Sequence, residues 1–253
     1  MSVDSAVHRE PGVRAELRIP THIGVIMDGN GRWARARGKP RTEGHVAGVK
    51  ALRRMVELCI RYGVRYLTVF SFSSENWTRP RDEVRFIFGL LHRFVASDLG
   101  TLIRNNVRVT IIGARDNLDE PLRRLINDVE SKTVMNTGLN LVVAFNYSGK
   151  AEITEATRRI AEAVAAGRLK PHEIDEKTVE RALYTSGTPD PDLIIRTSGE
   201  RRVSNFLLWQ AAYSEFVFVP EHWPDFNEQT FLRVLEEYSS RERRFGGIEA
   251  QSL

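Results

Sequence analysis

A carboxylate, a glycine-rich turn and a cluster of basic side chains follow one another closely near the start of this sequence. The apolar run 23–27 is followed directly by Asp28, Gly29, Asn30 and Gly31. Glycine lets a backbone approach a ligand closely, and asparagine tolerates turn conformations. The basic side chains come next, at Arg32, Arg35, Arg37, Lys39 and Arg41. This combination suits a phosphate or diphosphate bound with magnesium, although a plain turn with solvent-facing arginines would look the same.

Three further polar segments follow apolar runs and could join the same site. These segments cover residues 73–77, 146–149 and 196–202. Arginines in or beside them, Arg79, Arg196 and Arg202, could each hold phosphate oxygens through a bidentate guanidinium. The sequence carries neither of the glycine fingerprints of nucleotide-binding proteins and no His/Cys set at zinc spacing. The chemistry indicated is therefore that of an anionic substrate held by arginines.

Strands and helices alternate along the chain, and this alternation must position those segments. We predict strands over residues 23–27, 66–72, 107–112, 139–145, 193–196 and 216–219. We predict helices over residues 46–62, 82–105, 120–134, 150–166, 206–212 and 228–244. The pattern indicates an α/β fold with a mostly parallel sheet of about six strands flanked by helices. Ligands of open parallel sheets bind at the carboxyl ends of the strands, where the polar segments fall.

The composition fits one sizeable soluble domain. The chain has 253 residues, 42% hydrophobic and 28% charged, with a formal charge of +4. That charge is too small to predict a nucleic-acid partner, but it fits an anionic small substrate or an anionic membrane surface. No linker divides the chain, so we expect a flexible segment over residues 1–19, one domain over 20–247 and a tail over 248–253.

Cysteine usage and the lack of long apolar runs indicate a cytoplasmic protein. The single cysteine, Cys59, excludes a disulfide within the chain and falls on the apolar face of a predicted helix, where a core thiol is expected. No apolar run approaches the ~20 residues that cross a bilayer, and residues 1–19 lack the apolar stretch of a signal peptide.

Taken together, the motifs resemble the cis-prenyltransferase family, and within it the bacterial undecaprenyl diphosphate synthases. The resemblance spans about residues 20–247 and is carried, in order, by residues 22–33 with Arg41 and His45, 71–77 with Arg79, 192–200, 204–209, 223–225 and 241–247. It implies repeated condensation of isopentenyl diphosphate onto an allylic diphosphate, with farnesyl diphosphate the expected primer and undecaprenyl diphosphate, a carrier lipid for cell-wall polymers, the expected product. It also implies Mg²⁺ and a homodimer.

Three alternatives remain open at this stage. Two lie within the family: a synthase of shorter cis-prenyl diphosphates, and a non-catalytic partner subunit. The third is another enzyme on an α/β phosphate-binding scaffold, such as a phosphatase. The sequence fixes neither the product length nor the primer, and it does not show how the product reaches the membrane.

The resemblance assigns roles to individual residues. Asp28, expected to be a solvent-facing loop carboxylate, would act with Mg²⁺ on the leaving diphosphate, and Glu215 would be a second metal ligand. Asn76 would be catalytic as a positioning group, since a neutral amide is a poor base and the released diphosphate could accept the proton. Arg201 stands where bacterial relatives often carry a metal-linked histidine, and arginine cannot ligate magnesium. Substrate-binding roles fall to Gly29, Asn30, Gly31, Arg32, Trp33, Arg41, His45, Ser73, Ser74, Glu75, Trp77, Arg79, Arg196, Arg202, Val203 and Ser204.

A long prenyl chain needs an apolar space in which to grow. The predicted helix 82–105 has a broad apolar face that would lie beside a strand carrying Phe70 and Phe72 and a later strand carrying Leu141 and Val143. An ordinary core explains these residues, but the resemblance implies a hydrophobic tunnel between helix and sheet, with Ser71 near its entrance and Leu139 near its closed end.

The resemblance also bears on assembly and on the membrane. It places the segment 241–247 in a two-fold interface, with Arg244 and Gly246 reaching toward the neighbour's active site. The basic surface and the oily product make transient membrane contact an expectation, although no anchor is encoded.

Overall fold

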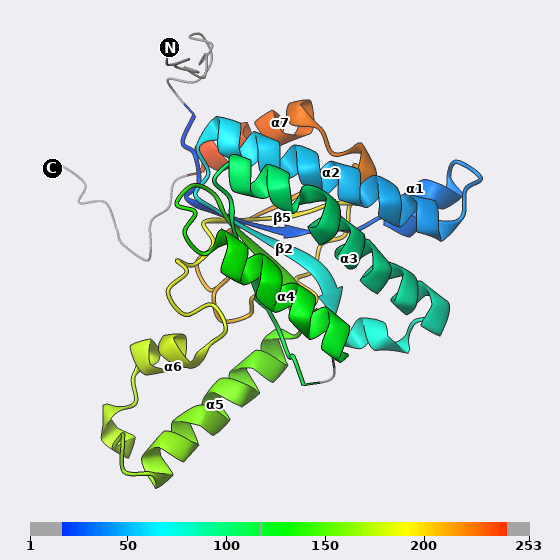
Figure 1. Cartoon of the computed structure of the whole chain (residues 1–253). Coiled ribbons are helices and arrows are strands. Elements are labelled where there is room, and N and C mark those ends of the chain that lie inside the picture. Colours follow the sequence, from blue (N-terminus) through cyan, green and yellow to red (C-terminus); the bar gives the residue numbers. More distant parts are fainter. Residues whose placement is uncertain (1–16, 117, 242–253) are drawn as a thin grey trace, which may run out of the picture.

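A six-stranded, all-parallel sheet forms the centre of the protein (Figure 1). The computed structural model describes residues 17–116 and 118–241. The strands are β1 His22–Ile26, β2 Tyr66–Ser73, β3 Arg108–Ile112, β4 Asn140–Tyr147, β5 Leu193–Arg196 and β6 Glu215–Phe218. Their order in the sheet is β3-β4-β2-β1-β5-β6. The predicted α/β class and the mostly parallel sheet of about six strands are confirmed.

Helices connect the successive strands from β1 to β5, as is usual in a parallel sheet, whereas turns connect β5 to β6. The α-helices are α1 Asn30–Arg35, α2 Arg41–Tyr62, α3 Arg81–Arg104, α4 Glu120–Thr133, α5 Gly149–Ala165, α6 Glu176–Ala182 and α7 Glu228–Ser239. Three short 3₁₀ helices are η1 Ser74–Thr78, η2 Pro171–Glu173 and η3 Trp223–Asp225. Most predicted helices are present, with ends shifted by a few residues.

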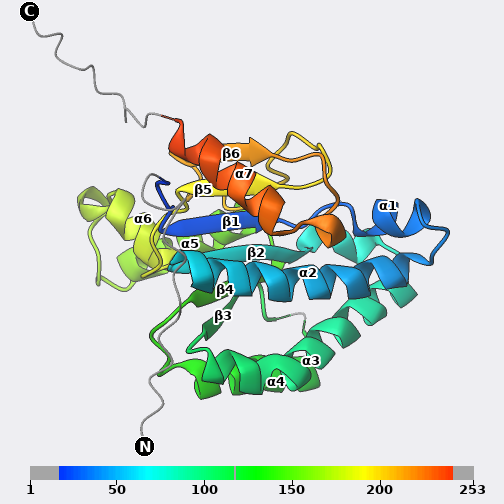
Figure 2. The same ribbon diagram turned by 90° about the horizontal axis from the view of Figure 1, so that it is seen from above.

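The main core lies between one face of the sheet and the helices α2, α3, α4 and α7, which gather on that face (Figures 1 and 2). Cys59 on α2 is fully buried there, and burial raises the pKa of its thiol, so it is the inert core residue that the sequence predicts. A smaller core on the other face is covered by the segment that follows β5, against which α5 begins.

Phe70 and Phe72 lie on opposite faces of the sheet, although residues two apart in a regular strand share a face. The reason is a bulge in the pairing of β2 with β4, where the register shifts between these two residues. The ring of Phe72 lies 5.2 Å from that of Phe88 on α3, as expected. The ring of Phe70 instead stacks on Phe206 at 4.8 Å, in the smaller core. Helix α3 therefore lies beside the strand that carries both residues, as expected, and only the ring of Phe72 faces it.

The predicted helix over residues 206–212 is absent, and turns stand in its place. Ser204, Asn205 and Leu207 have φ angles of 48°, 62° and 45°, in the left-handed region that a right-handed helix excludes. The side chain of Asn205 holds this path, because its Nδ2 donates to Ser148 Oγ at 2.7 Å. The apolar run indicated a helix, but it is apolar because it covers a sheet face.

Two short helices, α1 and α6, were not predicted. Helix α1 begins directly after Gly29, whose φ of 102° reverses the chain. A Cβ at Gly29 would lie 1.9 Å from Ser198 Oγ, so only glycine fits there. Close packing of α1 on α2 depends on Gly44, where a Cβ would lie 2.0 Å from the backbone oxygen of Asn30. The predicted final helix also ends earlier than expected, at Ser239.

Candidate active site

The carboxyl ends of β1, β2 and β5 open onto one cavity of about 720 Å³. Elements far apart in the sequence supply its walls, namely α1, α2, η1 and the segment after β5. It brings together most of the predicted site residues: Asp28, Gly29, Asn30, Gly31, Arg32, Arg41, His45, Ser73, Glu75, Asn76, Arg79, Arg196, Arg202 and Ser204. The polar segments thus converge as the parallel sheet predicts.

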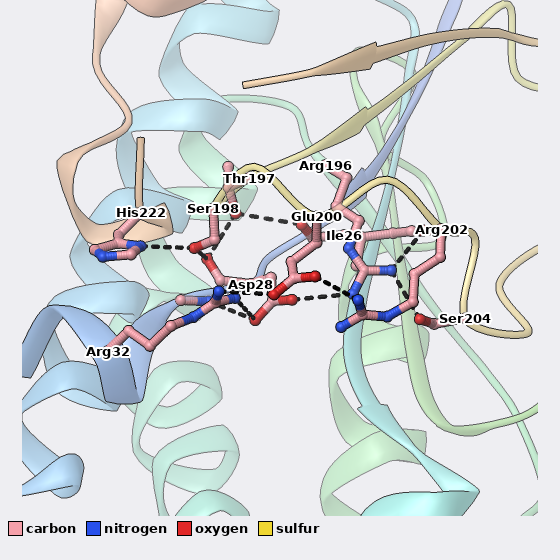
Figure 3. A network of polar contacts seen from close by, with 11 residues as sticks. Ile26, Asp28, Arg32, Arg196, Thr197, Ser198, Glu200, Arg202, Ser204 and His222 are labelled. Atoms are coloured by element: carbon pink, nitrogen blue, oxygen red, sulfur yellow. Dashed lines mark hydrogen bonds and ion pairs between the residues drawn. The ribbon is translucent and has the colours of Figure 1, made fainter. Parts of the chain in front are cut away.

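Asp28 lies between two arginines at the centre of this site (Figure 3). Its Oδ2 is 3.0 Å from Nη2 of Arg196, and its Oδ1 is 3.2 Å from Nη2 of Arg32. The backbone N–H of Gly29 also donates to Oδ1, at 2.7 Å. The side chain lies in the loop after β1 and is 28% exposed, so Asp28 is a loop carboxylate as expected, although only partly open to solvent. The pairing of Ile26 with Arg196 in the sheet brings the two charges together.

The surroundings of Asp28 keep it ionised. Partial burial by itself raises the pKa of its carboxyl group, but the hydrogen bond and charge of Arg196, with the charge of Arg32, outweigh it. The pKa therefore lies below its ordinary value, and Asp28 is an anion at neutral pH. An anionic oxygen ligand is what Mg²⁺ prefers.

Arg196 is a buried cation that joins the loop after β5 to Asp28. Its side chain is 4% exposed, and Nη1 donates to the carbonyl oxygen of Arg202 and, at 2.7 Å, to Ser204 Oγ. Its Nε is buried and has no hydrogen-bond partner among the described residues. A buried donor without a partner, at the wall of a cavity, suits an anionic ligand.

A carboxylate that the sequence reasoning missed, Glu200, bridges two of the arginines. Its Oε1 is 2.7 Å from Nη1 of Arg32, and its Oε2 accepts from Arg202 (Figure 3). Hydrogen bonds from Arg202 and Arg32 lower the pKa of Glu200. Arg32 lies in the helix that follows β1 and Arg202 in the segment that follows β5, so Glu200 joins two sides of the cavity. A lone acid in the basic run 200–202 was the available signal.

A second missed carboxylate, Glu83, holds three bases of the site. Its Oε1 is 3.1 Å from Arg41, 3.3 Å from Arg79 and 3.4 Å from Nε2 of His45. Burial raises the pKa of Glu83, but the charges of Arg41 and Arg79 outweigh it and leave the pKa lowered. Burial lowers the pKa of His45, in spite of Glu83. The spacing of Arg79 and Glu83, four residues apart, was the only local signal.

The segment after β2 forms the 3₁₀ helix η1 and presents Asn76 to the cavity. Asn76 Oδ1 accepts from the backbone N–H of Ser73 at 3.1 Å, so the amide is held in place. Trp77 donates from Nε1 to Asn146 Oδ1 at 2.8 Å. Ser74 and Trp77 are not among the residues that line the cavity.

Two other predicted substrate-binding residues stand outside the cavity wall. Trp33 donates from Nε1 to Asp225 at 2.7 Å, and the guanidinium of Arg37 lies 4.4 Å from its ring centre. Trp33 thus faces η3. Val203 lies between Arg202 and Ser204, which both line the cavity, but does not line it itself. Arg201, excluded from the metal set, is exposed.

Glu215 and Asp28 lie far apart within one chain. Glu215 begins β6 and pairs with Leu193, which is level with Ile23 on β1, whereas Asp28 lies five residues farther along. At ~3.3 Å per residue this separates them by roughly 16 Å along the strands, but oxygens that share one Mg²⁺ each lie ~2.1 Å from it. Asp28 and Glu215 of one chain therefore do not share an ion, and the role of Glu215 as a metal ligand stays a prediction. Glu215 instead pairs with Arg241 at 2.8 Å.

The donors present still fit magnesium bound together with substrate. Across the described ranges, no three His, Cys, Asp or Glu side chains are grouped so that they could hold a metal. Mg²⁺ is usually bound by one or two carboxylates with phosphate oxygens and water. Asp28, ionised and on the cavity wall, can supply that one carboxylate.

An apolar cavity of about 90 Å³ adjoins the site, between α2, α3 and the sheet. Its walls include Met27, Leu52, Leu91 and Val143. Ser71 lines both this inner cavity and the larger polar one, as expected for an entrance residue. Leu139 is buried in the main core before β4 and does not line the inner cavity.

Comparisons with known proteins agree with this geometry. Residues 26–246 match a family model described as putative undecaprenyl diphosphate synthase. The chain is 53% identical over 235 residues to the isoprenyl transferase of Rhizobium meliloti (strain 1021), covering 93% of this chain and 95% of that protein. It is 58% identical over 233 residues to the isoprenyl transferase of Brucella suis biovar 1 (strain 1330), covering 92% of each.

Two solved structures share the fold. The crystal structure of lavandulyl diphosphate synthase from Lavandula x intermedia in complex with dimethylallyl diphosphate has a TM-score of 0.87 and 37% identity, covering 90% of this chain and 98% of that one. A probable undecaprenyl diphosphate synthase from Campylobacter jejuni has a TM-score of 0.76 and 34% identity, covering 91% of this chain and 100% of the other.

Proposed function

The chain belongs to the isoprenyl transferase family of cis-prenyltransferases, and from this premise we propose how it works and what it makes. It is a prenyltransferase that acts on isoprenoid diphosphates. The proposed reaction is the successive condensation of isopentenyl diphosphate onto an allylic primer, farnesyl diphosphate, to give undecaprenyl diphosphate. The contact between Asp28 and Arg196 supports this reaction most directly, because it joins the two diphosphate subsites beside an apolar cavity.

The allylic diphosphate would lie against the turn after β1. Arg32, Arg41 and His45 line the cavity there and would contact its oxygens. In the structure, Glu200 pairs with Arg32 and Glu83 with Arg41. A bound diphosphate would replace these carboxylates as the hydrogen-bond acceptor of the arginines. Because arginines fixed before reaction stabilise charge as it develops, they lower the barrier to breaking the allylic C–O bond.

Asp28 would hold Mg²⁺ together with the diphosphate oxygens. When bound, the ion supplies positive charge that stabilises the leaving diphosphate. The low pKa of Asp28 keeps its carboxylate available across the neutral pH range.

Isopentenyl diphosphate would be held by Arg196, Arg202 and Ser204. As the allylic C–O bond breaks, a C–C bond forms to the isopentenyl unit, which then loses a proton. Asn76 is a poor acceptor for this proton, because a neutral amide is a weak base. Its Oδ1 accepts from the backbone N–H of Ser73, which holds the amide in place. Asn76 would therefore position the isopentenyl group, and the released diphosphate would accept the proton.

One assay tests the proposal. Purified protein is incubated with farnesyl diphosphate, labelled isopentenyl diphosphate and Mg²⁺, and the labelled products are resolved by length. Products centred near eleven isoprene units are expected. Products of only four or five units would assign the protein to the shorter-chain alternative, and the absence of labelled prenyl product with several allylic primers would refute the activity.

We also propose a homodimer, a cytoplasmic location and transient contact with a membrane. The family resemblance supports the dimer; the predicted contacts of Arg244 and Gly246 lie outside the described residues. Deleting residues 243–253 should lower activity and, by light scattering, shift the protein toward the monomer. Within the described ranges one helix, α3, is long and apolar enough to cross a membrane, judged by length and composition alone.

A further inference from the structure

Helices α2 and α3 enclose an apolar cavity on their inner side and a groove on their outer side. The inner cavity has a volume of about 90 Å³, and the outer groove about 550 Å³. Val49, Leu90 and Phe94 line both. Only a single layer of side chains therefore separates the space beside the active site from the surface of the molecule.

The two helices are tied together by ionic contacts at both ends of this shared wall. Near one end, Nε and Nη2 of Arg53 each lie 2.7 Å from an oxygen of Asp98. At the other end, Glu83 contacts Arg41 and His45. Val49 and Leu90, which lie between these ends, present apolar side chains. Directional ionic contacts therefore join the two helices at the ends of the seam, and non-directional apolar packing fills its middle.

The outer groove is apolar at its floor and basic at its rim. Val46, at its edge, is 40% exposed, and in the most apolar 18-residue stretch of α3 only 17% is buried. The charged and titratable residues that line the groove are Lys50, Arg53, His92 and Arg93, and no acidic residue lines it. A basic rim around an apolar floor is the pattern of surfaces that lie on anionic bilayers, where long basic side chains reach the headgroups.

The inner cavity is far too small for a growing prenyl chain. Its volume of about 90 Å³ is one eighth of the 720 Å³ of the active-site cavity. A longer tail must therefore displace side chains, and the wall formed by Val49, Leu90 and Phe94 is the thinnest part toward the surface. The groove lies directly beyond that wall.

From these observations we propose that the α2–α3 groove is the face with which the enzyme docks on an anionic lipid bilayer, so that the lengthening tail enters the lipid through the seam. This rests on the proposed prenyl transfer. The bilayer supplies both an acyl phase for the tail and negative charge for Lys50 and Arg93.

Vesicle binding tests the proposal without relying on activity. The full chain is sedimented with vesicles of phosphatidylcholine alone or mixed with phosphatidylglycerol. Binding to the anionic vesicles is expected. Each basic residue near such a surface contributes ~1 kcal/mol, or about a fivefold change in partition, so the double variant Lys50→Gln/Arg93→Gln should bind roughly 30-fold more weakly. The matched control Arg168→Gln/Lys177→Gln removes the same charge from exposed positions outside the groove and should bind normally.

A second variant separates docking from simple charge attraction. Val46→Asp places a carboxylate at the groove edge and should reduce binding as strongly as the double variant, because an apolar contact is lost and a like charge is added. Prenyl transfer in detergent should be unchanged in all of these variants, since none of the substituted residues lines the active-site cavity.

Equal binding by the groove variants and the control, or no binding of the wild-type protein to either vesicle, would overturn the docking proposal. Failure of the proposed function gives a different result, namely no prenyl transfer by the wild-type protein in detergent whatever the vesicles show.

Discussion

Replacing Asp28 by asparagine removes one negative charge from between Arg32 and Arg196 and keeps the shape of the side chain. The energetic consequence for folding follows from Arg196, which is buried and would lose its charge partner. Breaking a fully buried pair costs about 3–5 kcal/mol. Because Asp28 is 28% exposed and Arg196 keeps its bonds to Arg202 and Ser204, we expect about 1–3 kcal/mol in the free energy of unfolding.

The effect of Asp28→Asn on catalysis should be much larger than its effect on folding. Removing one preorganised group from a site of developing charge lowers turnover about 10²–10³-fold, and Asp28 would also lose its metal. The Michaelis constant for isopentenyl diphosphate should change less, because Arg196 and Arg202 remain. Turnover is measured with labelled isopentenyl diphosphate, and stability by denaturant unfolding of the same preparation.

The control is Glu130→Gln, whose carboxylate pairs with Arg115 and is 24% exposed, close to the exposure of Asp28, but lies outside the cavity. Glu130→Gln should lower the free energy of unfolding and leave the turnover rate unchanged. Near-normal turnover of Asp28→Asn would refute the assignment of Asp28.

The stabilisation of the fold by Asp28 should depend on pH. The folded-state pKa of Asp28 is lowered, so its stabilisation is complete above the unfolded value near 3.8 and is lost as the pH falls through the lower folded value. Asp28→Asn should therefore lower stability at neutral pH and make little difference at the acid end. An equal loss at both ends would show that the charge of Asp28 does not stabilise the fold.

The other predictions concern the second substrate, the tunnel and pH. Arg202→Ala should remove about 1.5–3 kcal/mol of binding free energy and so raise the Michaelis constant for isopentenyl diphosphate roughly 10–150-fold. A selective loss of affinity for the primer would reverse the subsite assignment. Ser71→Leu should shorten the products, because it fills the entrance shared by the two cavities. Leu139→Ala should cost about 2–5 kcal/mol in unfolding free energy, and longer products would place Leu139 at the tunnel floor. Burial lowers the pKa of His22 to about 4, so stability should be full above the unfolded value near 6.5 and fall by about 3 kcal/mol as the pH drops to 4. His22→Gln should remove that slope, which thermal unfolding at a series of pH values measures.

The sequence by itself determined the fold class and the edge of the sheet at which the site lies. Apolar runs such as 23–27 and 193–196 are short, continuous and separated by helical patterns, which is typical of the strands of a parallel sheet covered on both faces. Once the sheet is parallel, all strand ends of one kind meet at one edge. The grouping of Asp28, Asn76 and Arg196 therefore followed from local patterns alone.

The tertiary structure decided which groups touch one another. Asp28 and Arg196 are 168 residues apart, and only the register of β1 against β5 brings their charges to 3.0 Å. The strand pairing also places Glu215 at the opposite, amino-terminal ends of the strands. Glu83 and Glu200 look like ordinary surface acids in the sequence, because ion pairing depends on the distances between side chains from different elements. Residues 206–212 form turns for a similar reason: their burial against the sheet and the bonds of Asn205 outweigh the helical preference of the segment. Local propensity amounts to a few tenths of a kcal/mol per residue, and burial and charge pairing across the fold exceed it.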